Sequence, residues 1–250
     1  MRAHLMMTGL SSATAFSLRA GRSLNARGGA NMSTAADAAP GKIAVYYGNL
    51  PFWRAECVRM ALHIGGIEFE DVRDWAAGKQ MRTFGSLPIM TVDGKVLSQT
   101  QAMATYAGKL GGLYPTDPWA AAKCDELING CTDVTSVVSA TMRIKDETLK
   151  KEARADLVGP DGKLTVYLNG IDRILSENHD ASLFAVGAEL TVADLAIWRL
   201  AGWLDGGKLD GLPAGYTART FPRIAALLRA VDAHPGVASW KALHPDFYKT

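Results

Sequence analysis

Residues 86–100, SLPIMTVDGKVLSQT, contain the pattern that decides the fold. Two short runs rich in Val, Ile and Thr are joined at an Asp-Gly dipeptide, which is typical of a two-residue hairpin turn. Pro88 stands at the start of the first run, where a residue without an N–H group is tolerated on an edge strand. Gln99 and Thr100 close the second run where a helical pattern begins. The free N–H groups and positive dipole end of that helix predict a site for an anionic group, although Thr100 would also serve as a simple helix cap.

Strands and a helix alternate on the N-terminal side of this hairpin. The run KIAVYY, residues 42–47, is β-branched and aromatic and is followed by a Gly-Asn-Leu-Pro turn, which predicts a buried strand. Residues 52–66 have helical spacing of apolar side chains and stop at a Gly-Gly pair, and residues 67–73 alternate as a second strand. After the hairpin, residues 100–110 are again helical. This order predicts a small α/β domain over residues 41–115.

The pattern changes after the segment LYPTDP, whose prolines indicate a linker. No convincing strand follows, and Thr191 with Asp194 has the form of a capping box at the start of a helix. Long amphipathic runs occupy most of the remaining sequence: 118–146, 148–178 with a break at GPDG, 191–205 and 219–233. We therefore expect an all-helical domain over residues 119–250.

Composition and charge limit the class of protein. The chain has 250 residues, 48% of them hydrophobic, which is enough for a buried core. Residues 1–36 contain four arginines and no acid, so the remaining residues carry 27 − 4 = 23 basic groups against 25 acidic ones. A nucleic-acid partner is therefore not expected. No run of about 18 apolar residues occurs, so we expect no membrane span.

The first forty residues and the cysteines bear on the compartment. Residues 1–40 are rich in Ala, Ser and Gly and contain Arg, a composition typical of a transit peptide for a plastid or mitochondrion. The alternative is a disordered leader on a cytoplasmic protein. Cys57, Cys124 and Cys131 form no metal-binding or disulfide pattern. We therefore expect a reducing compartment and a protein without a metal site. Cys124 and Cys131 lie two helical turns apart and are expected to be core residues.

The motifs SLP, DGKVLSQT and ELTVADLAIW together resemble the cytosolic-type glutathione transferases, over roughly residues 42–245. The resemblance is closest to the sigma-like class, to which glutathione-dependent prostaglandin D synthases belong. The spacings between four positions match the pattern of that class: Trp75, Lys79, Pro88 and Gln99. The resemblance implies a thioredoxin-like, glutathione-binding α/β domain at residues 41–115, followed by the all-α domain at 119–250.

The resemblance implies that the bond before Pro88 is cis and that the backbone of Leu87 pairs with the cysteinyl backbone of glutathione, as an added strand would. Gln99 and Thr100 would hold the α-amino acid end of the γ-glutamyl group. From residue type alone, Pro88 would be interpreted as an edge-strand proline with a trans bond.

Three further positions are matched in the same way. Lys79 would face the glycine carboxylate of glutathione, and Trp75 would cover that end with its indole N–H. Asp125 would reach the γ-glutamyl amino group bound to a neighbouring subunit, which implies a homodimer. From residue type alone, the lysine and the aspartate would be solvated surface groups and the tryptophan a core residue.

Glutathione chemistry requires the thiolate, and a free thiol is mostly protonated at neutral pH. In this family a tyrosine at the end of the first strand donates a hydrogen bond to the sulfur. The matching pair is Tyr46 and Tyr47, and the tyrosine-then-aromatic order of the family favours Tyr46. Only one of them can face the sulfur, because successive strand residues face opposite sides. Arg54 would lie near the tyrosine hydroxyl, after a loop at residues 48–53 that is longer than the family pattern.

The resemblance implies an enzyme of detoxification that conjugates glutathione, its co-substrate, to small hydrophobic electrophiles without a metal. The electrophile would occupy an apolar cleft lined by Phe52-Trp53, the helix around Met142, and Phe247-Tyr248. Two alternatives remain open. One is a glutathione-dependent isomerase or peroxidase acting on lipid peroxides, and the other is a glutathione-binding protein without turnover.

Overall fold

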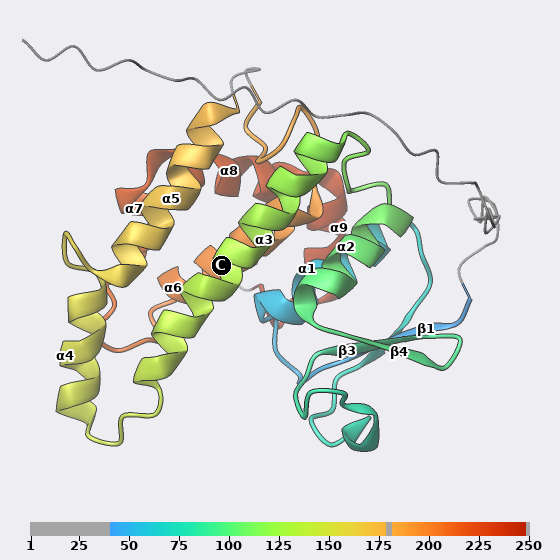
Figure 1. Ribbon diagram of the computed structural model, residues 1–250, viewed down its shortest axis with the longest axis horizontal. Coiled ribbons are helices and arrows are strands. Elements are labelled where there is room, and N and C mark those ends of the chain that lie inside the picture. The colour runs from blue at the N-terminus through green and yellow to red at the C-terminus, as the bar shows by residue number, and fades with distance from the viewer. Residues whose placement is uncertain (1–40, 179–181, 249–250) are drawn as a thin grey trace, which may run out of the picture. The chain divides into compact units, whose positions relative to one another are not determined.

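The computed structural model describes residues 41–178 and 182–248 (Figure 1). The predicted leader at residues 1–40 lies outside the described residues. Strands and helices alternate in the first half, in chain order: β1 (Ile43–Tyr46), α1 (Trp53–Ile64), β2 (Glu70–Val72), η1 (Lys79–Met81), β3 (Ile89–Val92), β4 (Lys95–Ser98) and α2 (Thr100–Leu110). The four strands form one sheet in the order β2-β1-β3-β4. Strand β1 is parallel to β2 and antiparallel to β3, and β3 is antiparallel to β4.

The predicted hairpin is present. Asp93 and Gly94 form its turn, and both have positive φ, 50° and 77°, as the tight turns of two-residue hairpins require. The Asp93 carboxylate accepts a hydrogen bond from Lys42 N–H at 2.9 Å, which ties the turn to the start of β1. The peptide bond between Leu87 and Pro88 is cis, as the resemblance implies.

The rest of the chain is helical where it is described. Its helices are α3 (Pro118–Thr141), α4 (Glu147–Leu157), α5 (Lys163–Glu177), α6 (Val192–Asp205), α7 (Tyr216–Thr220), α8 (Pro222–Ala233) and α9 (Pro235–Leu243). The break predicted at GPDG separates α4 from α5. The short helices α7 and α9 were not predicted. None of the described helices is both long and apolar enough to cross a bilayer.

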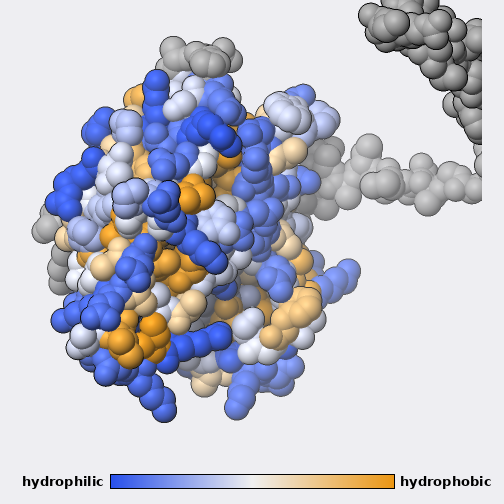
Figure 2. Space-filling view, turned by 60° about the vertical axis from the view of Figure 1, so that its left-hand side comes forward, coloured by the Kyte–Doolittle hydropathy of each residue, from blue (hydrophilic) through white to orange (hydrophobic). Residues whose placement is uncertain are grey.

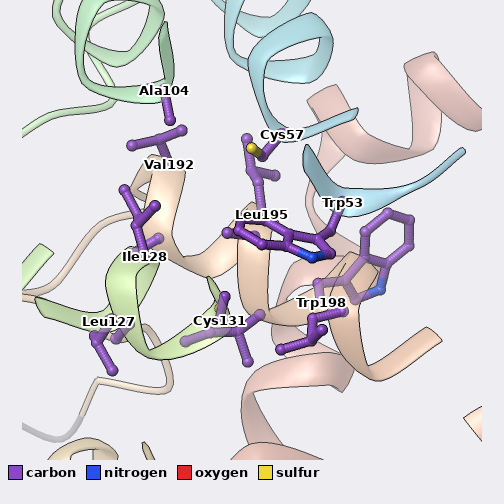
Figure 3. Packing of buried hydrophobic residues seen from close by; sticks show 14 of the residues in the cluster. Trp53, Cys57, Ala104, Leu127, Ile128, Cys131, Val192, Leu195 and Trp198 are labelled. Atoms are coloured by element: carbon purple, nitrogen blue, oxygen red, sulfur yellow. The ribbon is translucent and has the colours of Figure 1, made fainter. Parts of the chain in front are cut away.

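One hydrophobic core joins the two halves. Figure 3 shows Trp53 and Cys57 of α1 close to Leu195 and Trp198 of α6, with Cys131 of α3 nearby. Figure 2 shows a surface that is mostly hydrophilic on the face it presents, with small hydrophobic groups between the polar side chains. The apolar stripes of the helices therefore face inward, as the amphipathic patterns predict.

The cysteines and the capping box are part of this core. All three cysteines are free and buried, which confirms the expectation for Cys124 and Cys131 and places Cys57 in the core as well. Burial raises the pKa of the Cys57 and Cys124 thiols to about 12, so both stay protonated. At the start of α6, the buried Asp194 carboxylate accepts hydrogen bonds from Thr191 N–H and Thr191 Oγ1, both at 2.7 Å. The predicted reach of Asp194 back to Thr191 is confirmed.

Candidate active site

A small pocket lies where the hairpin meets the first turn of α2. Gln99 is the N-cap of α2 and has φ 74°, an uncommon value for a residue other than glycine. Its side chain makes no capping hydrogen bond, which leaves N–H groups of the first turn available to a ligand. The pocket brings together the four predicted residues of this region with their neighbours: Arg54, Phe84, Ser86, Leu87, Pro88, Ser98, Gln99 and Thr100.

The two tyrosines at the end of β1 face opposite sides of the sheet. Tyr46 is paired with Ile89 across β1 and β3, and a side chain added at Gly78 would come 3.3 Å from Tyr46 Cδ1 and 3.2 Å from Ile89 Cδ1. Tyr46 therefore lies on the face covered by the segment around η1. Tyr47 lines an apolar cleft on the other face, together with Arg54 and Leu87. The structure brings Tyr47, and not Tyr46, next to the hairpin pocket.

The surroundings of Tyr47 keep its hydroxyl protonated. Burial raises its pKa above the ordinary value, and the positive charges of Arg54 and Arg59 oppose this only in part. Arg54 lines both the hairpin pocket and the apolar cleft. A protonated phenol and a cation therefore line the same cleft, an arrangement that would stabilise an anion placed between them.

The other predicted residues lie outside the hairpin pocket. The Trp75 ring is 4.9 Å from the Tyr47 ring, and 54% of Trp75 is exposed. This contact requires Gly48, because a Cβ there would come 2.0 Å from the Trp75 ring. Lys79 is exposed at the start of η1. Asp125, on α3, accepts a hydrogen bond from Thr105 Oγ1 of α2 at 2.9 Å within the same chain.

The apolar cleft has a volume of about 370 Å³ and borders a second cavity of about 620 Å³. Four residues line both cavities: Leu50, Phe52, Met142 and Trp203. Phe247 and Tyr248 line the second, so most of the predicted electrophile cleft is assembled. Trp53 is the exception. It is fully buried, and its indole N–H donates to Thr135 Oγ1 at 2.8 Å.

The sequence did not reveal the polar cluster behind the cleft. Glu56 of α1 is fully buried, pairs with Arg59 at 3.2 Å, and accepts hydrogen bonds from Trp240 Nε1 at 2.8 Å and the Tyr248 hydroxyl at 2.5 Å. Arg59 also pairs with Asp71 at 2.8 Å. Residues near the C-terminus of the chain therefore contact α1, the first helix. Contacts of this kind join residues 184 and 192 positions apart and leave no local signal in the sequence.

A second contact that the sequence missed reaches the loop between Tyr47 and α1. Arg199 of α6 donates two hydrogen bonds to the Pro51 carbonyl, from Nε at 3.0 Å and from Nη2 at 2.7 Å. An arginine on an amphipathic helix usually reaches solvent, so its residue type gave no indication of this role.

Comparison with known proteins identifies the class of protein. The family profile described as "Glutathione S-transferase, C-terminal domain" matches residues 132–244. The chain is 31% identical over 156 residues to glutathione S-transferase 1 of Ascaris suum, an alignment that covers 59% of this chain and 74% of the relative. The chain belongs to the glutathione S-transferase family, whose enzymes use glutathione as co-substrate.

Within this family, the relatives agree with the sigma-like resemblance. The chain is 29% identical over 196 residues to the hematopoietic prostaglandin D synthase of Gallus gallus, covering 77% of this chain and 92% of that protein. The structure titled "prostaglandin synthase D of Nilaparvata lugens" has the same fold, with a TM-score of 0.68, 24% identity, and coverage of 80% of this chain and 97% of that one.

Proposed function

We propose that this enzyme activates the thiol of glutathione through Tyr47 and transfers the thiolate to a small hydrophobic electrophile in the cleft of about 370 Å³. The observation that carries this proposal is the position of Tyr47 beside both Arg54 and Leu87. Leu87 is the residue that would pair with the cysteinyl backbone of glutathione, so the sulfur would lie close to the Tyr47 hydroxyl.

The chemistry follows from the charges in this cleft. The thiol loses its proton to solvent, and the thiolate accepts a hydrogen bond from the Tyr47 hydroxyl, which stays protonated because burial raises its pKa. The positive charge of Arg54 favours the same anion. With an aryl halide as acceptor, the sulfur forms a bond to the ring carbon and the halide leaves as an anion.

Glutathione would be held along the hairpin edge. Leu87 and Pro88 supply backbone pairing, and Gln99 with Thr100 receives the γ-glutamyl end at the start of α2. We assign the glycine end to Trp75, whose ring lies 4.9 Å from the Tyr47 ring, and to the exposed Lys79.

The experiment compares wild type with Tyr47→Phe and Tyr46→Phe in the conjugation of glutathione to an aryl halide. Tyr47→Phe keeps the ring against Trp75 and removes one donor, so kcat should fall about 100-fold. Tyr46→Phe changes a hydroxyl on the other face of β1 and should leave kcat within about twofold. Equal activity of all three proteins would rule out a tyrosine as the activating group, and calorimetric binding of glutathione without turnover would favour a binding protein.

The partner-subunit role of Asp125 is also part of the proposal, together with a homodimer. Its test pairs Asp125→Ala with Thr105→Val, because both changes remove the hydrogen bond between the two side chains. We expect only Asp125→Ala to weaken glutathione binding, by about tenfold, in a protein that sediments as a dimer. Equal weakening by the two variants would assign the effect to the bond within the chain.

A second candidate function is the isomerisation or reduction of lipid peroxides, in which the same thiolate attacks a peroxide oxygen and the O–O bond breaks. In isomerisation the S–O bond then breaks again and releases the thiolate, and in reduction a second glutathione thiol displaces the oxygen and glutathione disulfide forms. The 29% identity to a prostaglandin D synthase and the second cavity of about 620 Å³ beside the cleft favour it. Assays with a fatty acid hydroperoxide and with an endoperoxide separate this function from conjugation.

A further inference from the structure

The loop of residues 48–52 forms part of the wall between the two cavities. Leu50 and Phe52 each line both cavities, and Pro51 lies between them. Within the loop, Leu50 N–H donates to the Gly48 carbonyl at 2.8 Å. Pro51 has no N–H group, so its carbonyl is the polar backbone group through which it can be held.

Arg199 holds this carbonyl in a forked arrangement. Its Nε and Nη2 donate to the same oxygen at 3.0 and 2.7 Å, across 148 residues of sequence. A rigid, planar guanidinium loses little conformational freedom in such a contact. The wall is therefore held from α6.

The guanidinium is itself fixed from two sides. It lies 5.3 Å from the Trp198 ring and 5.2 Å from the Tyr248 ring, within the range of cation–π attraction. Gly202, one turn further along α6, lies directly against it, because a Cβ there would come 2.7 Å from Arg199 Nη1. Tyr248 in turn donates to Glu56. The position of the Pro51 carbonyl thus depends on α6, the C-terminal segment and α1 together.

We propose that Arg199 is a positioning residue that sets acceptor specificity by holding the wall formed by Leu50 and Phe52. This inference rests on the proposed function, since it concerns the cleft in which the electrophile reacts. With Pro51 held, a small acceptor is confined to the cleft next to Tyr47. With Pro51 released, the loop moves and the two cavities merge into one. Small acceptors then bind less tightly, and long acceptors fit better.

The experiment compares Arg199→Leu, Arg199→Lys and Gly202→Ala with wild type. It measures KM for an aryl halide, for a long-chain unsaturated aldehyde and for glutathione, and amide hydrogen exchange in residues 48–54. Arg199→Leu should raise KM for the aryl halide about fivefold and leave KM for glutathione unchanged. It should also raise the ratio of long-chain to aryl halide turnover and speed exchange in the loop. Arg199→Lys, which keeps one donor, should give intermediate values.

Gly202→Ala tests the same contact without changing the arginine. Alanine is favoured over glycine inside a helix, so the fold should be retained while the added methyl displaces the guanidinium. We expect the same direction of change as in Arg199→Leu. Gly170→Ala, in α5, is the matched control, because nothing lies within 4 Å of a Cβ there, and it should change none of these quantities.

Unchanged loop exchange in both Arg199→Leu and Gly202→Ala would overturn the inference even if acceptor KM changed, because Arg199 and Gly202 also line the second cavity and would then act there directly. An equal rise in KM for glutathione would also overturn it, because that result describes a general loss of structure. Faster loop exchange in a protein that conjugates no acceptor would contradict the proposed function and leave the role of Arg199 in holding the loop intact.

Discussion

The two walls of the candidate site are held in different ways. The proposed glutathione side is built by the hairpin and the first residue of α2, so Leu87, Pro88, Gln99 and Thr100 come from one short stretch. The acceptor side is built by a loop whose position depends on Arg199, far away in sequence. A wall held by local geometry is insensitive to changes elsewhere, whereas a wall held by remote contacts responds to them. Under the proposed function, changes at remote contacts such as that of Arg199 should alter the acceptor side and leave the glutathione side unchanged.

Glu56→Ala should produce the largest effect, because it removes the buried acid behind the acceptor side. Arg59 would be left buried without this partner, which costs about 3–5 kcal/mol of unfolding free energy. Urea denaturation at fixed protein concentration measures it. Glu126→Ala, which removes the exposed partner of Lys123, should change the same quantity by less than about 1 kcal/mol. Similar losses in the two variants would show that the Glu56 cluster gives no special support.

The pH dependence of the unfolding free energy tests the contribution of Asp194, in the first turn of α6, the helix that carries Arg199. Burial raises the pKa of Asp194 from 3.8 to about 6, so the folded state holds this proton more tightly than the unfolded state. The resulting stabilisation is complete below pH 3.8 and is lost as the pH rises to about 6.

The unfolding free energy of wild type relative to Asp194→Asn should therefore fall by about 3 kcal/mol over this pH window. Chemical denaturation at several pH values measures the difference. A rise with pH would mean that the donors from Thr191 and Ala185, which favour the carboxylate, outweigh burial.

Thr100→Ala should affect the glutathione side alone. Loss of a hydroxyl that bonds a charged group should raise KM for glutathione about tenfold, with KM for the acceptor unchanged. Thr100→Ser keeps the hydroxyl and should behave as wild type. A change in acceptor KM of similar size would mean that the two walls are not independent.

A matched pair of phenylalanines gives the smallest effects. Phe52 lines the proposed acceptor cavities and Phe84, which is 64% exposed, lines the hairpin pocket. Phe52→Ala should raise KM for the aryl halide about threefold, and Phe84→Ala should raise KM for glutathione about twofold. Steady-state kinetics with each substrate varied in turn measures KM for the aryl halide and KM for glutathione in both variants. A variant that changes both KM values would contradict the separation of the two walls.

The same contrast explains what the sequence could predict. The hairpin, its turn and the change from strand to helix at Gln99 and Thr100 follow from local rules of periodicity and turn chemistry. The structure contains all three. The helices of the second half were located by their amphipathic spacing. Helices α7 and α9 were missed because they are short, although Pro235 at the start of α9 was an available signal.

The choice between Tyr46 and Tyr47 required the packing of the sheet. Alternation shows that the two side chains diverge, but it does not show which face the helices cover when Ala44 and Val45 are both apolar. The contact between Arg199 and Pro51 was beyond reach for another reason. Its two residues are brought together only by the folded chain, and each alone has an ordinary alternative in solvent.

The cluster at Glu56 has a consequence for the order in which this protein can mature. Synthesis runs from the N-terminus, so α1 emerges long before the two donors, Trp240 and Tyr248, that complete the bonding of its buried carboxylate. In a nascent chain that stops before Trp240, the buried Glu56 carboxylate of the first domain lacks two of its hydrogen-bond donors. Translation of α9 and the segment after it should therefore stabilise the domain made first, and chains that end before Trp240 should unfold more readily and be degraded faster.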